Sequence, residues 1–253
     1  MPDPRPYDVR FEIQLHPPGE EWTRIAYDSI YDDDGIRHLD SFYLTMLELI
    51  NPTVGSTLLD VACGEGVLSN LARSRYGVQA YGTDISLAAA RIGAVEGGAG
   101  FGVAVGEHLP FVENSFDYVT CIGSLEHFLN VERGIRELAR VLKPGGMACL
   151  LLPNTYSLLN NIYKAYKTGM STVDSQPMQR YAARGEWAML LERNGFEITH
   201  TTKYEREQPR SLQDALWYAQ HWRECVKLAV TPIIPVNLAS SIVYLCRPAR
   251  ECP

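Results

Sequence analysis

Between residues 57 and 152 the chain alternates short apolar runs with segments whose apolar residues recur every three or four positions. The short runs predict strands, and the periodic segments predict helices. The predicted strands are 57–61, 78–83, 101–105, 116–122 and 147–152, with helices over 67–75, 86–95 and 131–142. In the last of these helices, four apolar residues share one face: Val131, Ile135, Leu138 and Leu142. Strands separated by helices at this rhythm predict the α/β class, with a doubly wound parallel sheet.

The flanking regions have a less regular pattern. We expect an extended arm over residues 1–18 and a helical cap over 20–50. The acidic segment Asp32-Asp33-Asp34-Gly35 interrupts the helical pattern of the cap, and its spacing favours a solvated loop over a cation site. We expect a main domain over 51–253. Within it we expect three further features: a helical insertion at about 155–180, a long helix at about 211–230 and final strands over 196–202 and 241–246.

Composition narrows the class of protein. The 253 residues are 46% hydrophobic and 21% charged, which is typical of a globular chain, and the net charge is −7. An acidic surface lowers the expectation of nucleic acid or anionic lipid as partner. Six cysteines include no C-x-x-C pair, and neither the N-terminus nor the proline-interrupted stretch 228–245 has the pattern of a signal peptide or a membrane span. We therefore expect a cytoplasmic protein without a membrane span.

Distinctive residues follow three predicted strands. The turn Asp60-Val-Ala-Cys-Gly64-Glu-Gly66 follows the first strand, Asp84 ends the second, and Gly106-Glu107-His108 follows the third. In a parallel sheet, the carboxyl ends of the strands meet at the ligand-binding edge. Glycines let backbone amides approach a ligand, Asp84 can accept both ribose hydroxyls, and residues 106–108 could reach a purine ring. The pattern predicts a nucleoside ligand.

The turn distinguishes two nucleoside cofactors. A dinucleotide fingerprint requires G-x-G-x-x-G, and this chain has Ser69 in place of the third glycine. Asp60 would also repel a pyrophosphate, whereas it would attract a cationic amino group. S-adenosylmethionine has such a group and no phosphate, so the residues favour it over a nicotinamide cofactor.

Four motifs together carry a family resemblance: Leu-Leu-Asp60-Val-Ala-Cys-Gly-Glu-Gly66, Gly82-Thr-Asp84-Ile-Ser, Leu109-Pro-Phe followed by Ser115-Phe-Asp117-Tyr-Val, and Leu142-Lys-Pro-Gly-Gly146. Over residues 55–153 the chain resembles the class I S-adenosylmethionine-dependent methyltransferases, in particular the small-molecule branch that includes quinone-biosynthesis enzymes. The resemblance implies a Rossmann-like seven-stranded sheet with 241–246 as an antiparallel seventh strand. We also expect helical elements that form a lid over the carboxyl edge of the sheet.

The resemblance also implies a cofactor site, with S-adenosylhomocysteine as the product. Asp60 and the glycine backbone would hold the methionine end, Asp84 the ribose and Glu107 the adenine amino group. The implied cofactor-binding residues are Asp60, Ala62, Cys63, Gly64, Gly66, Asp84, Ile85, Glu107, His108, Ser124 and Leu125.

Residues for the acceptor are less specified. His127 is placed either as a general base or as a helix-start residue with a structural hydrogen bond. Asn154 could bind substrate or cap a helix, and we expect Tyr156 in the pocket wall. Other aromatic candidates are Tyr163, Tyr166, Trp217, Tyr218 and Trp222.

Several functions are disfavoured by missing residues. Gly123 replaces the first glutamate of an E-x-x-E-H cation site, so we expect no metal. The [DNS]-P-P-[FYW] tetrapeptide of DNA amino-methylating relatives is absent, so we expect no DNA substrate. We expect methyl transfer to an O, N or C atom of a small-molecule acceptor. A tRNA or protein methyltransferase and a non-catalytic S-adenosylmethionine-binding regulatory protein remain alternatives, and the oligomeric state is open.

Overall fold

The computed structural model describes residues 11–14, 19–33, 35–173 and 176–249. The strands are β1 (Phe11–Gln14), β2 (Thr57–Val61), β3 (Gln79–Asp84), β4 (Gly100–Val103), β5 (Phe116–Ile122), β6 (Leu142–Pro153), β7 (Met178–Tyr181), β8 (Phe196–Tyr204) and β9 (Ser241–Pro248). The α-helices are α1 (Glu20–Asp33), α2 (Asp40–Ile50), α3 (Val67–Tyr76), α4 (Leu87–Glu96), α5 (Val131–Val141), α6 (Tyr163–Thr168), α7 (Arg184–Arg193), α8 (Leu212–Gln220) and α9 (Trp222–Val230). Single turns of helix are η1 (Leu125–His127), η2 (Leu158–Ile162), η3 (Thr231–Ile233) and η4 (Val236–Leu238).

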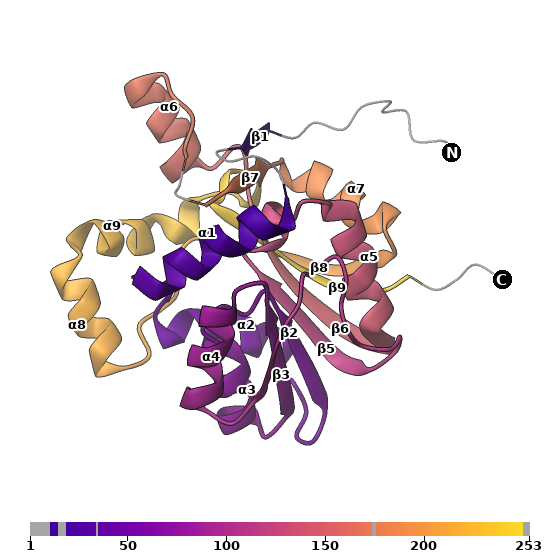
Figure 1. Cartoon of the computed structure of the whole chain (residues 1–253). Coiled ribbons are helices and arrows are strands. Elements are labelled where there is room, and N and C mark those ends of the chain that lie inside the picture. The colour runs from indigo at the N-terminus through magenta and orange to yellow at the C-terminus, as the bar shows by residue number, and fades with distance from the viewer. Residues whose placement is uncertain (1–10, 15–18, 34, 174–175, 250–253) are drawn as a thin grey trace.

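One seven-stranded sheet forms the centre of the molecule, in the order β4-β3-β2-β5-β6-β9-β8 (Figure 1). Neighbouring strands from β4 to β6 are parallel, and β9 runs antiparallel to both β6 and β8. The predicted doubly wound sheet with an antiparallel seventh strand is therefore confirmed. From β2 the chain first builds one side of the sheet through β3 and β4, and then crosses to β5 on the other side. The order reverses between β2 and β5, where such sheets bind ligands.

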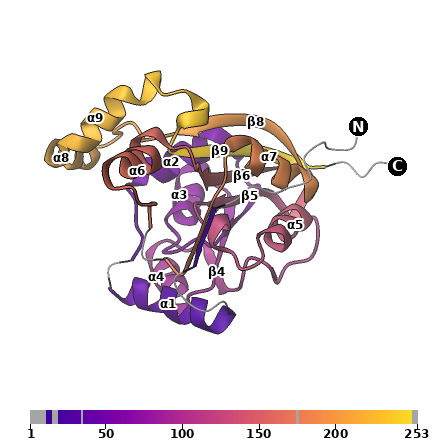
Figure 2. The ribbon, with the colours of Figure 1, turned by 90° about the horizontal axis from the view of Figure 1, so that it is seen from above.

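Helices cover both faces of this sheet, with α3 and α4 on one side and α5 and α7 on the other (Figures 1 and 2). Because successive strand residues point to opposite faces, Leu58 enters the core beside α2 and α3, whereas Leu59 enters the core beside α5 and α7. In α5 the buried residues Ile135 and Leu138 share the face predicted from their spacing. Burial on both faces explains why the strands are continuous apolar runs.

Three segments differ from the sequence predictions. Phe11–Gln14, within the predicted arm, forms β1 and pairs antiparallel with β7, while residues 1–10 and 15–18 lie outside the described ones. The insertion is helical only over η2 and α6, because Met178–Tyr181 is the partner strand of β1. The helix predicted at 211–230 is divided into α8 and α9 at His221, whose φ of −117° and ψ of 64° are not helical. There the His221 ring stacks on Trp217, with 4.2 Å between ring centroids.

No helix among the described residues is both long enough and apolar enough to cross a membrane.

Core packing predicts the effect of shortening Ile135, whose side chain is fully buried. Ile135→Ala should lower the free energy of unfolding by about 2–5 kcal/mol, through lost apolar burial and the cavity left behind. Ile233→Ala is the matched control, because Ile233 is 79% exposed, and its effect should stay within about 0.5 kcal/mol. Urea titration of both variants measures the difference, and equal losses would contradict this assignment of the core.

Candidate functional site

A cavity lies at the carboxyl ends of β2, β3 and β5, where the strand order reverses. It brings together nine of the residues predicted from the sequence: Asp60, Ala62, Cys63, Gly64, Asp84, Ile85, Glu107, Ser124 and His127. A second group of lining residues comes from α1, from the segment around α2 and from the insertion: Thr23, Tyr27, Tyr31, Ile36, His38, Tyr43 and Gln176. The cavity therefore has a floor made by the sheet edge and a cover made by the N-terminal helices.

Two buried carboxylates form the floor. Asp60 accepts a hydrogen bond of 2.7 Å from the Thr120 hydroxyl, and burial raises its pKa to about 7 despite that bond. Asp84 accepts from the backbone amides of Gly64 at 2.8 Å and Ser86 at 2.9 Å. Burial raises the pKa of Asp84 to about 6, and the backbone amides oppose this rise. Both groups are negative acceptors in a site with little water to solvate them, so a ligand with cationic or hydroxyl donors would stabilise them.

The turn after β2 places its backbone in the cavity. Gly64 has a φ of +54°, and a Cβ at this position would lie 2.7 Å from the Tyr31 hydroxyl of α1. Ala62 also adopts a positive φ, of 55°, which is uncommon for a residue with a Cβ. Gly66 has a different role, because a Cβ there would collide with the Phe101 ring at 2.3 Å. Gly64 thus opens the backbone to the cavity, whereas Gly66 allows β4 to pack against the start of α3.

Cys63 lines the cavity as a thiol. Burial raises its pKa well above the ordinary value, and the nearby Asp84 and Asp60 carboxylates raise it further. A thiolate nucleophile is therefore disfavoured at this position.

The loop after β5 forms the opposite wall. Ser124 and His127 line the cavity, whereas Leu125 between them is fully buried. The His127 ring is 9% exposed, and its Nδ1 lies within hydrogen-bond distance of the Met178 carbonyl oxygen in β7. Since a carbonyl can only accept, Nδ1 carries the proton and Nε2 is the basic nitrogen in the neutral ring. The Nε2 atom lies 3.8 Å from Oε1 of Glu126.

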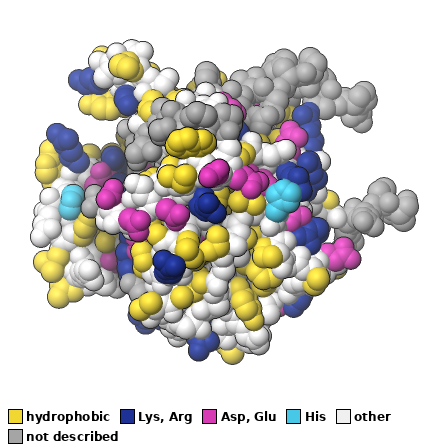
Figure 3. All heavy atoms as spheres, in the orientation of Figure 1, with side chains coloured by type: hydrophobic (Ala, Val, Ile, Leu, Met, Phe, Trp, Pro, Cys, Tyr) yellow, Lys and Arg dark blue, Asp and Glu magenta, His cyan; other side chains and the backbone are white. Residues whose placement is uncertain are grey.

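Helix α1 covers the cavity with an amphipathic surface. Thr23, Tyr27 and Tyr31 recur every four residues and face inward, and Figure 3 shows acidic and basic side chains on the outer face that carries α1. The Tyr27 hydroxyl donates to Oε1 of Gln176 at 2.9 Å, which joins the cover to the insertion. Asp28 accepts from the Ser86 hydroxyl at 2.6 Å and from the Ala88 amide at 3.2 Å, which fastens α1 to the start of α4.

Sequence reasoning missed these covering residues individually. Their signal was the four-residue spacing from Thr23 through Tyr27 to Tyr31, which places three hydrogen-bonding side chains on one helix face. This spacing alone does not predict that the helix face contacts the carboxyl edge of the sheet.

Other predicted site residues lie outside the cavity lining. His108 is exposed, and its Nδ1 lies 2.9 Å from the Arg133 guanidinium. Asn154 is fully buried, and its amide nitrogen donates to the carbonyls of Asn237 and Ala239, both at 2.9 Å. Tyr156 is half exposed. Of the other aromatic candidates, Tyr163, Tyr166 and Trp222 are exposed, and Tyr218 is buried with its hydroxyl on the Glu207 carbonyl.

No group of three or more His, Cys, Asp or Glu side chains that could hold a metal occurs in the part of the chain that the structure describes.

The sheet topology and the cavity together define a Rossmann-like protein with a ligand site at its switch point. Residues 59–150 match the family described as "Methyltransferase domain". These residues contain most of β2 through most of β6, and with them the turn after β2, Asp84 and the loop after β5. Over these residues the chain is therefore similar to the class I S-adenosylmethionine-dependent methyltransferases.

Individual relatives agree with this family. The chain is 32% identical over 157 residues to a "Ubiquinone biosynthesis O-methyltransferase" of Sodalis glossinidius, covering 59% of each chain. It is 34% identical over 122 residues to a "Demethylmenaquinone methyltransferase" of Corynebacterium kroppenstedtii, covering 46% of this chain and 51% of that one. Among the first curated relatives, the chain spans between 51% and 74% of their lengths.

Among solved structures, the fold is similar to that of phosphoethanolamine N-methyltransferase 2 of Haemonchus contortus in complex with S-adenosylhomocysteine. The TM-score is 0.62 at 17% identity, and the match covers 89% of this chain and 57% of that one. At this identity the likeness concerns the fold alone.

The raised pKa of Asp60 predicts how stability depends on pH. A carboxyl whose pKa is higher in the folded than in the unfolded state stabilises the fold when protonated, and that stability is lost as pH rises through about 7. In Asp60→Asn the amide cannot ionise, and the Thr120 and Ser69 hydroxyls can reorient toward it. Relative to this variant, wild type should lose on the order of 1–3 kcal/mol between about pH 5 and 8.

Thermal and urea unfolding of the ligand-free protein across this pH range measures the difference. Asp40→Asn is the control, because the Asp40 side chain is 57% exposed. Parallel stability curves for wild type and Asp60→Asn would contradict the assigned burial of this charge.

Proposed function

We propose that this protein transfers a methyl group from S-adenosylmethionine to an O, N or C atom of a small-molecule acceptor. The observation that carries the proposal is a single cavity that has Asp60 and Asp84 on one wall, His127 on another and α1 above them. Its parts correspond to the needs of the reaction: groups for the cofactor, a candidate base and a cover that limits water.

The cavity residues fit the cofactor by their chemistry. Asp60 is a buried carboxylate whose raised pKa marks an uncompensated negative charge, which a cationic amino group would neutralise. Asp84 would accept the ribose hydroxyls while the amides of Gly64 and Ser86 hold it in place. Ile85 offers an apolar surface to the adenine, and Glu107 an acceptor for its amino group. When bound, the cofactor supplies a methyl group activated by a positively charged sulfur.

The protein's own groups would orient the acceptor and move one proton. Orientation in a preformed cavity supplies most of the rate enhancement in a displacement of this kind. His127 would take the proton of an O or N nucleophile at Nε2, since the Met178 carbonyl occupies the Nδ1 side. The cover formed by α1 would exclude water from the reacting atoms.

The cover formed by α1 favours a small-molecule acceptor over RNA or protein. Tyr27 and Tyr31 lie over the cavity, and the outer face of α1 carries Glu21, Asp32 and Asp33, which would repel a nucleic acid backbone. The names of the relatives support the same class, because one is named for ubiquinone biosynthesis and another for demethylmenaquinone, both small molecules.

Asp84 tests the cofactor site. Asp84→Ala should weaken binding of S-adenosylmethionine at least tenfold, about 1.4 kcal/mol, since the ribose acceptor is lost. Calorimetric titration measures the affinity, with Asp40→Ala as the exposed control. Because the Asp84 pKa is about 6, wild-type affinity should also fall as pH decreases below that value. Affinity that is unchanged in the variant and constant with pH would remove Asp84 from the site.

His127 tests the catalytic step. Acceptors are first identified by release of S-adenosylhomocysteine from a panel of catechols, phenols and amines. With an O or N acceptor, His127→Ala should lower turnover by about 10²–10⁴-fold while cofactor affinity stays near wild type. His200→Ala, on the exposed part of β8, is the control. Equal turnover would leave His127 with a structural role, and labelling of tRNA or protein in place of the panel would favour a macromolecular acceptor.

A further inference from the structure

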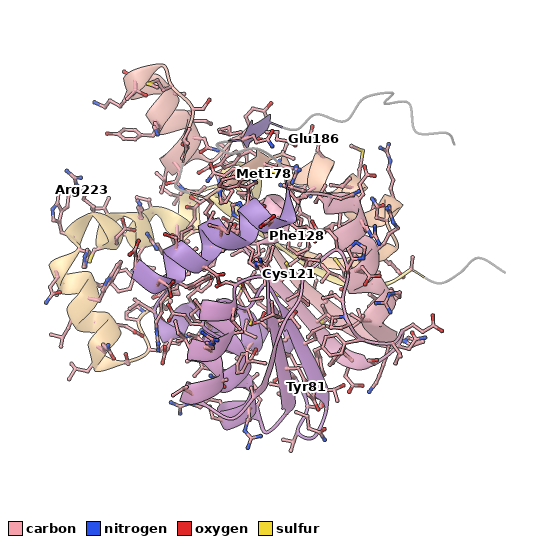
Figure 4. All side chains as sticks on the ribbon, in the orientation of Figure 1. Tyr81, Cys121, Phe128, Met178, Glu186 and Arg223 are labelled. Atoms are coloured by element: carbon pink, nitrogen blue, oxygen red, sulfur yellow. The ribbon has the colours of Figure 1, made fainter. Side chains whose placement is uncertain are left out.

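Arg180 of β7 is a buried cation directed at the loop that carries His127. The residue is 4% exposed, and its guanidinium donates to three backbone carbonyls of that loop. One terminal nitrogen donates to the carbonyls of Glu126, at 3.3 Å, and Phe128, and the other donates to that of Leu129 at 3.1 Å. Figure 4 labels Met178 just above α1 and Phe128 just below it.

The cost of burying this charge indicates that the contacts are specific. A buried guanidinium is tolerated when its charge is paired and its donors are satisfied. Arg180 meets both conditions, because its Nε donates to Glu12 of β1 at 2.8 Å while the terminal nitrogens hold the loop. Lysine carries the same charge on one nitrogen and cannot span three carbonyls in one plane.

The same strand also contacts the His127 ring. Met178 and Arg180 are two positions apart in β7, and the strand offers the loop a backbone carbonyl at the first position and a guanidinium at the second. The Met178 carbonyl accepts from Nδ1 of His127, while Arg180 fixes the backbone on both sides of that residue. One short strand therefore determines both where the loop lies and which ring nitrogen carries the proton.

We propose that Arg180 is a positioning residue, which holds residues 126–129 so that the Met178 carbonyl keeps His127 in its Nδ1–H form. Glu12 of β1, which pairs with β7, holds the Arg180 guanidinium in place. A segment outside the family match at 59–150 therefore helps to position the candidate base. The catalytic value of the arrangement rests on the function proposed above, but the tautomer itself does not.

Nuclear magnetic resonance of the full chain with ¹⁵N-labelled histidine tests the proposal. Two-bond ¹H–¹⁵N correlations distinguish the tautomers, and the loss of signals in His127→Gln assigns them. Wild type with S-adenosylhomocysteine, at a pH where the ring is neutral, should show the Nδ1–H pattern. Arg180→Met and the milder Arg180→Lys should both lose this pattern in favour of exchange between tautomers. Their affinity for S-adenosylhomocysteine should change less than about threefold.

Arg140→Met is the matched control. Arg140 also pairs with a carboxylate, that of Glu137, and donates to the carbonyls of Phe111 and Leu109, but it does not contact the His127 loop. This variant should keep the wild-type His127 pattern.

Each outcome decides the proposal. An unchanged Nδ1–H pattern in folded Arg180→Lys would overturn it, and so would the same loss of pattern in Arg140→Met, which would indicate general destabilisation. If Arg180→Met does not fold, Arg180→Lys decides alone. Failure of the proposed function is separate: turnover that survives His127→Ala would remove the base role and leave the tautomer result unaffected.

Discussion

Asp60 and Asp84 are negative groups buried at the ends of two neighbouring strands, and their solvation by the protein organises the site around them. The amide of Gly64 points at Asp84, which fixes the turn after β2, and the amide of Ser86 points at the same carboxylate, which fixes the start of α4. The Ser86 hydroxyl in turn donates to Asp28, so the cover is attached to the floor of the cavity. These hydrogen bonds do not fully offset the desolvation of the two carboxylates, so burial raises the pKa of each carboxyl. A ligand that brings cationic or hydroxyl donors would therefore be stabilised in this cavity.

The sheet and its binding edge could be predicted because their signals are local. Residues such as Leu58 and Leu59 reveal a strand buried on both faces, and the spacing of Ile135 and Leu138 reveals a helix with one apolar face. Parallel strands place their carboxyl ends at one edge, so the sequence predicts that Asp60, Asp84 and His127 lie together. The antiparallel position of β9 came from the family resemblance, since neither residue spacing nor composition distinguishes it.

The cover and the strand behind His127 depend on contacts that residue spacing does not encode. Tyr27 meets Gln176 across 149 positions, and Arg180 meets Phe128 across 52. Tertiary pairing also turned Met178–Tyr181 into a strand within a predicted helical insertion, because β1 offered its backbone as a partner. Asn154, which the sequence left open between a substrate contact and a helix cap, lies outside the cavity lining, and its amide holds the backbone before β9.

A crystal structure of the protein grown with S-adenosylhomocysteine would locate the cofactor site. We expect the ligand in the cavity beneath α1, with its ribose hydroxyls on Asp84, its amino group on the Asp60 side, and its sulfur facing the wall formed by Ser124 and His127. Ligand bound with its ribose away from Asp84, or bound outside this cavity, would show that the two buried carboxylates do not form the cofactor site.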